Sequence, residues 1–241
     1  MILIDVGNTN VNFAFLRNKK AKKIVKFPTN KISEIFLRKL IRPYKDEEII
    51  LCSVVPKVTS VFRKVSKNLG IVGKDLKVPI GCFYDKGKVG ADRLVAAYAA
   101  KCLFPNTRFV LDFGTAITLD FLSIKGAYQG GIILPGVGST LRALSKCALL
   151  PKRFNIKKTK KIIPTNTNSS INKGIQVGFS LMVNSLVRKY KKELNIRPYE
   201  RIVLTGGEAK IIIKKLDFSF SYEPLLVLKG LEMLAKHYSI V

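Results

Sequence analysis

Two aspartate motifs in the sequence have the residue types that hold the phosphates of a nucleotide. Residues 2–9 form an apolar run ending in Asp-x-Gly, and residues 109–116 repeat this pattern 107 positions later. In both copies an alternating strand pattern follows, at 11–15 and at 117–121. Glycine lets phosphate oxygens approach the backbone, and an aspartate can hold the accompanying cation directly or through water. Such residues are also ordinary in tight turns, so it is the matching pair that favours the phosphate site.

A third aspartate, Asp92, lies in the run Gly90-Ala91-Asp92-Arg93, just before an apolar helical pattern. The chain has one histidine, His237, which excludes a two-histidine zinc site and leaves acid–base chemistry to carboxylates unless His237 itself serves. Asp92 by itself is most simply a first-turn residue favoured by the helix dipole. If the chain activates a hydroxyl, however, an aspartate suffices, because phosphoryl transfer asks a base mainly to orient the attacking oxygen.

The composition indicates a globular protein with an anionic partner. The 241 residues include 43 Lys and Arg against 16 Asp and Glu, a formal net charge of +27, with 47% hydrophobic residues. Such a charge suits nucleic acid, an acidic membrane surface or a phosphorylated small molecule. The lysine runs at 19–23 and 157–161 lack the interleaved aromatics of a single-strand binder. We therefore predict that both runs are solvated loops and that nucleic acid is not the main partner.

The expected cellular location of the protein is based on sequence patterns that it does not contain. The four cysteines include no CxxC pair, the first residues reach Asp5 without a signal-peptide pattern, and no apolar stretch approaches the length of a membrane span. We expect a cytoplasmic protein with reduced thiols and no membrane partner.

Strand and helix patterns alternate along the chain, which predicts an α/β fold. Strands are expected at 2–6, 11–15, 49–51, 108–112, 117–122, 127–134 and 201–205. Helices are expected at 31–42, 57–69, 138–147 and 169–194, with a short one after Gly207 and a last one opening at Glu223-Pro224. Residues 151–168 read as a polar loop. The repeated hairpin predicts two domains related by duplication, 1–107 and 108–241, with a cleft between them.

Two glycine-rich segments, 130–136 and 205–207, accompany these elements. Each is explained equally well by a turn or by a place where a ligand lies close to the backbone.

Together these motifs resemble the type III pantothenate kinases of the actin-like, sugar-kinase-like phosphotransferase superfamily. The matching residues run in order along nearly the whole chain: Asp5-Val6-Gly7-Asn8-Thr9-Asn10, Ser53-Val54-Val55-Pro56, Gly90-Ala91-Asp92-Arg93, Asp112-Phe113-Gly114-Thr115-Ala116, residues 130–136, Asn166-Thr167 with Gly174, and Thr205-Gly206-Gly207. The resemblance implies two ribonuclease-H-like (actin-like ATPase) domains. It also implies transfer of the ATP γ-phosphate to the pantothenate hydroxyl, giving 4'-phosphopantothenate, the first step of coenzyme A biosynthesis.

The resemblance also implies roles for individual residues. ATP would be bound by Asp5, Val6, Gly7, Asn8, Thr9, Asn10, Val11, Asn12 and Thr115. Asp92 would be the proton acceptor, and pantothenate would be bound by Phe83, Gly90, Ala91, Asp92, Arg93 and Thr167. Asp112 would hold a monovalent cation, K⁺ or NH₄⁺, while Mg²⁺ accompanies ATP, and the protein would be a homodimer.

The chain departs from the family pattern in the segment Lys86-Gly87-Lys88, where the family more usually has proline and acidic residues, and at one aromatic position. Phe83 stands where the family commonly has a tyrosine, with Tyr84 next to it. Either the hydrogen bond of a tyrosine hydroxyl to pantothenate is lost here, or Tyr84 supplies it after a shift of one residue.

Two other functions fit the same residues. One is a kinase of the same fold that acts on another small alcohol, such as a sugar. The other is a non-catalytic regulatory relative that contacts nucleic acid, although the intact Asp5, Asp92 and Asp112 argue against a degenerate catalyst.

Overall fold

The computed structural model describes residues 1–17, 20–85, 87–147, 150–151 and 162–240. The lysine run at 157–161, Lys19 and residues 152–161 of the predicted loop lie outside the described residues. The contacts group the chain into two compact units, the first made of Met1–Pro105, Asp120–Gly130 and Leu225–Val241, the second of Asn106–Leu119 and Gly131–Pro224. The predicted division at 107/108 concerns the duplicated halves and stays a prediction.

The first sheet has the strand order β3-β2-β1-β4-β5. Its strands are β1 (Ile2–Val6), β2 (Asn10–Arg17), β3 (Lys20–Pro28), β4 (Ile49–Ser53) and β5 (Leu69–Ile71). β2 runs antiparallel to both β1 and β3, whereas β4 pairs in parallel with both β1 and β5. The strand that ends at Asp5 and Val6 is therefore the centre of the sheet.

The second sheet repeats this arrangement. Its strands are β6 (Thr107–Phe113), β7 (Ala116–Leu122), β8 (Tyr128–Pro135), β9 (Arg201–Thr205) and β10 (Ser221–Tyr222). Their order is β10-β9-β6-β7-β8, which is the order of the first sheet when β6 to β10 are matched with β1 to β5. The predicted α/β class is confirmed, and the repeat seen in the sequence corresponds to two sheets with the same strand order.

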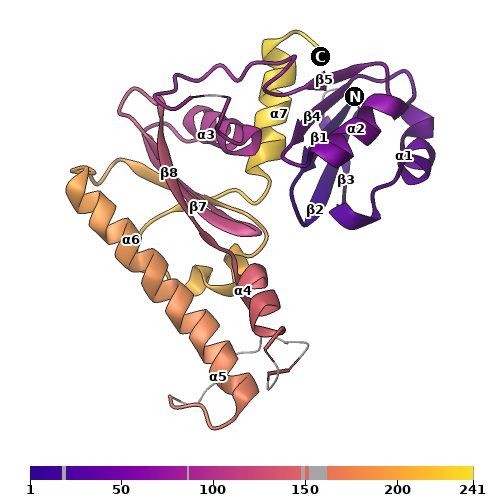
Figure 1. The fold of residues 1–241 in the computed structure, drawn as a ribbon. Helices are drawn as coiled ribbons and strands as arrows, with labels where there is room; N and C mark the ends of the chain where they lie inside the picture. The colour runs from indigo at the N-terminus through magenta and orange to yellow at the C-terminus, as the bar shows by residue number, and fades with distance from the viewer. Residues whose placement is uncertain (18–19, 86, 148–149, 152–161, 241) are drawn as a thin grey trace. The chain divides into compact units, whose positions relative to one another are not determined.

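In the described part of the first unit the α-helices are α1 (Glu34–Ile41), α2 (Pro56–Val65), α3 (Ala91–Leu103) and α7 (Leu226–His237). α7, yellow in Figure 1, packs against α3 and against β1. Gly230 makes this close packing of the two helices possible, because a Cβ there would lie 2.5 Å from Cγ1 of Val95. The last helix of the chain thus completes the unit that contains its first strand.

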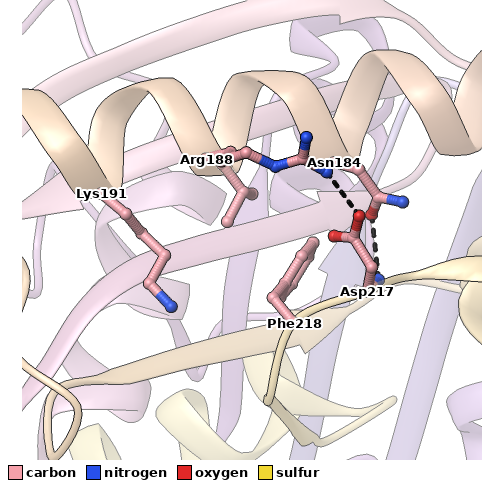
Figure 2. A pocket seen from close by; sticks show the side chains of 6 residues that line it. Asn184, Arg188, Lys191, Asp217 and Phe218 are labelled. Carbon is pink, nitrogen blue, oxygen red and sulfur yellow. Dashed lines mark hydrogen bonds and ion pairs between the residues drawn. The ribbon is translucent and has the colours of Figure 1, made fainter.

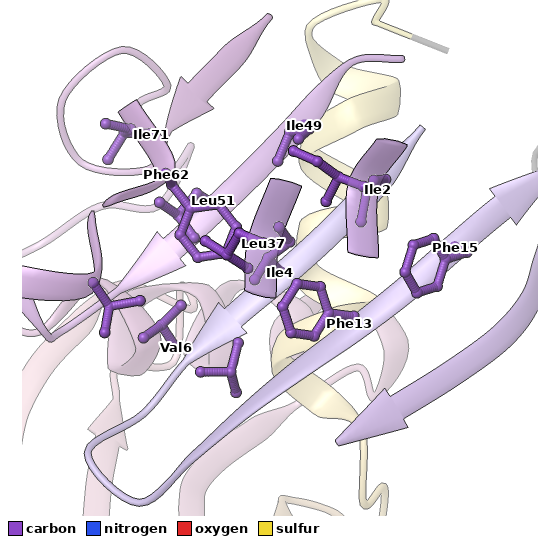
Figure 3. Close-up of a cluster of buried hydrophobic side chains, with 13 residues drawn as sticks. Ile2, Ile4, Val6, Phe13, Phe15, Leu37, Ile49, Leu51, Phe62 and Ile71 are labelled. Atoms are coloured by element: carbon purple, nitrogen blue, oxygen red, sulfur yellow. The ribbon is translucent and has the colours of Figure 1, made fainter. Parts of the chain in front are cut away.

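β1 is buried on both faces in the core of the first unit, and Figure 3 shows the apolar cluster on one of these faces. Ile2, Ile4 and Phe13 are fully buried on one sheet face together with Leu37 of α1 and Phe62 of α2. On the opposite face of the central strands, Leu3 and Ile50 are 2% and 1% exposed, and α3 and α7 contact this part of the sheet. A strand buried on both faces has little freedom, so the residues at its carboxyl end are held firmly.

The second unit contains α4 (Val137–Leu144), α5 (Thr167–Lys173) and α6 (Phe179–Glu193). A single π-helical turn, Gly174–Gly178, joins α5 to α6. The helix predicted at 169–194 is therefore present but interrupted. The wider π-helical turn begins and ends with a glycine, Gly174 and Gly178.

Three predictions of local structure were wrong. Lys20 to Lys23 belong to β3, not to a solvated loop; lysines on an edge strand discourage pairing with other chains, while Val25 and Phe27 pack on the core. The helix predicted at 57–69 ends at Val65, and Leu69 instead pairs with Ile49 in the sheet. The last helix begins at Leu226, after Glu223 donates its N–H to the carbonyl of Leu204. Among the described residues, no helix has both the length and the apolar character needed to cross a membrane.

Candidate active site

The first aspartate motif forms the turn between β1 and β2. Asp5 is the cross-strand partner of Asn12, whose Nδ2 donates to Asp5 Oδ2 at 3.0 Å. The N–H of Gly7 donates to the Asn10 carbonyl at 2.9 Å and closes the turn, leaving Asn8 and Thr9 exposed. Polar donors and one carboxylate therefore gather at the end of a rigid strand.

Thr29, which belongs to none of the sequence motifs, holds this turn through two hydrogen bonds. It is 7% exposed and follows the last residue of β3. Its hydroxyl donates to the Gly7 carbonyl at 2.7 Å, and its N–H donates to the Thr9 carbonyl at 2.9 Å. Residues 7–9 are thus held by two hydrogen bonds from one neighbouring residue.

Asp92 lies in the first turn of α3, as its sequence pattern predicted. A Cβ on Gly90 would lie 2.5 Å from Asp92 Oδ1, so only glycine leaves the carboxylate room to fold back over the helix start. There Oδ1 accepts the N–H of Arg93 at 2.8 Å. The glycine of this motif sets the orientation of its aspartate.

The pKa values of Asp5 and Asp92, both in the first unit, are raised. Burial raises the pKa of Asp5 to about 6, against the hydrogen bond from Asn12 and with help from the negative charge of Asp92. Burial also raises the pKa of Asp92, opposed by the Arg93 N–H and reinforced by the charge of Asp120. Two partly buried carboxylates with raised pKa values can share a cation or accept a proton.

Arg93 does not stand alone beside Asp92. Its guanidinium forms an ion pair with Asp120 of β7, with Nη2 at 2.6 Å from Oδ1, and Tyr128 of β8 donates its hydroxyl to the same oxygen at 2.7 Å. An Asp inside the apolar strand pattern of 117–122 was the signal that could have identified Asp120.

Phe83 and Tyr84, the two candidates for the family's aromatic position, are 76% and 51% exposed. The N–H of Phe83 donates to the Tyr128 carbonyl at 2.9 Å. The ring of Tyr84 lies next to Gly130, whose φ is +126° and whose Cβ position is 3.7 Å from Tyr84 Cδ2. The glycine-rich segment thus begins under the Tyr84 ring.

The second aspartate motif forms the turn between β6 and β7 and is enclosed by glycines. Gly206 has a φ of +92°, and a Cβ on it would lie 2.5 Å from the N and O of Phe113 and closer still to Asp112 Oδ1. A Cβ on Gly136 would lie 2.6 Å from the Thr115 carbonyl and closer still to that of Gly114. The sequence left open whether each glycine-rich segment is a turn or a ligand site. In the structure Gly136 of the first segment and Gly206 of the second both pack on the second turn.

Thr167, predicted to reach the substrate, begins α5 in the second unit and is exposed. Asn166 caps this helix by accepting the N–H of Ser169 at 2.9 Å. The predicted residues Asp5, Phe83 and 90–93 belong to the first unit, whereas Asp112, Thr115 and Thr167 belong to the second.

The first turn offers one carboxylate, Asp5, with the amide of Asn12 beside it. Among the described residues, no group of three or more His, Cys, Asp or Glu side chains is placed to hold a metal ion. Mg²⁺ bound to a nucleotide typically takes one or two protein carboxylates and fills its other positions with phosphate oxygens and water. Asp5, with Asn12 beside it, fits that demand.

A shallow pocket beside α6 contains none of the motif residues (Figure 2). It is lined by Asn184, Val187, Arg188, Lys191, Asp217 and Phe218. Arg188 pairs with Asp217 at 2.6 Å, and Asn184 accepts the N–H of Asp217 at 3.2 Å. These contacts attach the segment around Asp217 to α6, and a role in stabilising the fold is sufficient to explain them.

The fold is shared with several solved structures. A conserved putative Baf family transcriptional activator from Campylobacter jejuni superimposes with a TM-score of 0.66 at 22% identity, over the whole of both chains. The ethanolamine utilization protein EutJ from Carboxydothermus hydrogenoformans gives 0.55 at 13% identity, covering 97% of this chain and 89% of that one. At these identities the likeness concerns the fold.

Sequence comparison is more specific. The family model described as type III pantothenate kinase matches residues 1–189. The chain is 34% identical to the type III pantothenate kinase of Persephonella marina, covering 96% of each chain. It is also 34% identical to that of Dehalococcoides mccartyi strain 195, covering 97% of this chain and 96% of the relative. The chain therefore belongs to the type III pantothenate kinase family.

Proposed function

We propose that this protein is an ATP-dependent pantothenate kinase, which transfers the γ-phosphate of ATP to the pantothenate hydroxyl and yields 4'-phosphopantothenate for coenzyme A biosynthesis. The observation that carries the proposal, within a chain of this family, is the placement of Asp92. Its carboxylate lies at the start of α3 with a raised pKa and beside an arginine.

Asp92 orients the pantothenate hydroxyl and accepts its proton. A raised pKa brings a carboxyl closer to neutral pH, where a base combines availability with proton affinity. Gly90 and Ala91 contact pantothenate through their backbone, and the guanidinium of Arg93 pairs with its carboxylate. Phe83 and Thr167 are the other residues that we assign to pantothenate binding. The negative charge of the transferring group is balanced by cations and N–H donors.

The first turn receives the ATP phosphates. Gly7 has space on its Cβ side, where the nearest atom is the Asn10 carbonyl at 3.4 Å, and Asn8 and Thr9 are exposed donors. The family resemblance assigns Asp5 to Asn12 of the first unit, and Thr115 of the second unit, to ATP. Asp5 would hold the Mg²⁺ that accompanies ATP, Asp112 would hold K⁺ or NH₄⁺, and these cations would neutralise phosphate charge. The enzyme acts as a cytoplasmic homodimer.

A coupled assay of ADP formation tests the proposal. Wild-type protein is measured with ATP and Mg²⁺, with and without pantothenate, first in potassium and then in sodium. We expect turnover that requires pantothenate and is faster in potassium. Turnover independent of pantothenate, or none in any condition, would contradict the proposal, and a panel of sugars in the same assay tests for another alcohol acceptor.

The Asp92→Asn variant tests the role of the base. We expect it to fold normally and to lose about 10²- to 10⁴-fold in kcat, the usual contribution of a positioned base. Asp46→Asn, which changes an exposed aspartate of the same unit, is the control and should keep the wild-type rate. An Asp92→Asn variant as fast as this control would show that another group takes the proton.

A further inference from the structure

The side chain of Arg93 is held by an aspartate that belongs to neither aspartate motif. Asp120 Oδ1 accepts from Arg93 Nε at 2.9 Å and from Nη2 at 2.6 Å, and from the Tyr128 hydroxyl at 2.7 Å. Asp120 and Tyr128 are each 1% exposed, whereas the side chain of Arg93 retains 18% of its exposure. A buried aspartate and tyrosine thus anchor an arginine that reaches the surface.

The anchoring leaves a defined part of the guanidinium for a ligand. Arginine has five N–H donors in a planar fork. Asp120 takes the Nε–H and one N–H of Nη2. The Nη1 group and the second N–H of Nη2 form the end of the fork, which matches the two oxygens of a carboxylate. The Tyr128 ring, whose centroid is 5.9 Å from Arg93 Cζ, adds a cation–π contact that restricts rotation of this plane.

The charges and hydrogen bonds of Arg93, Asp120 and Tyr128 stabilise one another. Burial, followed by the charge of Asp120, raises the pKa of the Tyr128 hydroxyl, so the hydroxyl remains a donor at physiological pH. A buried carboxylate without partners would be costly, but here three N–H and O–H donors converge on one oxygen. The network therefore persists without a ligand, and the fork is ordered before one binds.

We propose that Asp120 and Tyr128 are positioning residues, which aim Arg93 at the carboxylate of the substrate and thereby set the preference of the enzyme for an acid over a neutral analogue. This inference rests on the proposed pantothenate kinase activity. Asp92 and Arg93 are adjacent on α3, so fixing the guanidinium also fixes where the substrate hydroxyl lies relative to the base. Neither Asp120 nor Tyr128 touches the substrate.

The test compares pantothenate with its primary amide, which lacks the negative charge. For Asp120→Asn we expect kcat/KM with pantothenate to fall about 10- to 100-fold, mainly through KM, as for a hydrogen-bonded charged group. With the amide the loss should stay below about threefold, so the preference for the acid collapses. Tyr128→Phe keeps the ring and should show the same pattern with a loss of about 2- to 10-fold.

The controls separate the outcomes. Asp46→Asn and Tyr199→Phe change exposed residues of the same types and should leave both substrates unaffected, and thermal unfolding shows whether each variant is folded. An Asp120→Asn variant that loses both substrates equally, or neither, would overturn the inference; if that variant does not fold, Tyr128→Phe decides by the same criterion. Wild-type protein inactive with pantothenate would instead reject the proposed function.

Discussion

The turns of the two aspartate motifs have the same support but different surroundings. Each follows the central strand of its sheet, and in each sheet the third strand ends in a proline, Pro28 or Pro135, 107 residues apart. A hydroxyl from the segment after that proline donates to a carbonyl of the turn. Thr29, directly after Pro28, donates to Gly7 at 2.7 Å, and Ser139, four residues after Pro135, donates to Thr115 at 2.6 Å. Both turns are therefore held by a hydroxyl, although the two donors stand at different positions of the repeat.

The space around the two turns differs. Gly7 has only a carbonyl at 3.4 Å on its Cβ side, whereas Gly136 and Gly206 press directly on the backbone of the second turn. The first turn is open where a phosphate can approach, and the second is filled by its own chain. We infer that substitutions in the first turn mainly affect ATP binding, whereas substitutions around the second mainly affect stability.

Gly136→Ala should have the largest effect. Its Cβ would lie within 2.6 Å of the Thr115 carbonyl, and backbone on both sides cannot move without breaking the turn. We expect a loss of about 3–5 kcal/mol in unfolding free energy, measured by urea denaturation. Gly174→Ala, where nothing lies within 4 Å, is the matched control, and equal stability of the two variants would refute the difference between the turns.

Asp5→Asn should stabilise the protein in the absence of nucleotide and Mg²⁺ while abolishing ATP turnover. Because folding raises the pKa of Asp5 from 3.8 to about 6, the folded state binds the extra proton, and this contribution to stability is present below about pH 4 and lost as pH rises to 6. Two pKa units correspond to about 3 kcal/mol. Urea unfolding from pH 4 to 8 should show that the unfolding free energy of the variant rises relative to wild type up to pH 6 and stays higher above it. A difference that is the same at every pH would contradict the raised pKa of Asp5.

Thr29→Val removes the hydroxyl but keeps the N–H that donates to Thr9. We expect a loss of about 1–2 kcal/mol in unfolding free energy and a several-fold rise in KM for ATP, because residues 7–9 loosen. Thr29→Ser should restore both. Ser139→Ala, the counterpart in the second turn, should cost similar stability with less change in KM, and the reverse order would contradict the assignment of the first turn to the phosphates.

Gly7→Ala should have the smallest effect on stability, below about 1 kcal/mol, since its Cβ meets only ordinary van der Waals contact. The added methyl occupies the open side of the turn, so KM for ATP should rise in steady-state kinetics. A variant that unfolds as readily as Gly136→Ala would show that the first turn is also filled.

Sequence patterns were sufficient for the parts of the fold in which apolar residues repeat regularly. β1, β4, β6 and β9 are apolar runs because they are buried in the middle of a sheet, and the helices with one apolar face were found for the same reason. β3 was missed because an edge strand tolerates lysines, and β5 because Leu69 continued the spacing of the preceding helix by coincidence. Local patterns contain no information about which distant strand will lie alongside.

The candidate site was predictable only where chemistry and spacing coincide. The three aspartates stand in recognisable motifs, but Thr29 and Asp120 act through hydrogen bonds to residues 22 and 27 positions away. Nothing near either residue in the sequence indicates its partner. Such residues become visible once the strands are placed.

The packing of α7 on β1 has a consequence for synthesis. A ribosome releases β1 before α7, so the first unit cannot close its core until α7 has emerged. Until then, α7 does not cover the apolar sheet face that includes Leu3 and Ile50. A growing chain with such an exposed face avoids aggregation through chaperones or through fast synthesis and folding. Chains terminated before Leu225 would lack that cover permanently, so prematurely ended copies are exposed to proteolysis from the moment of release.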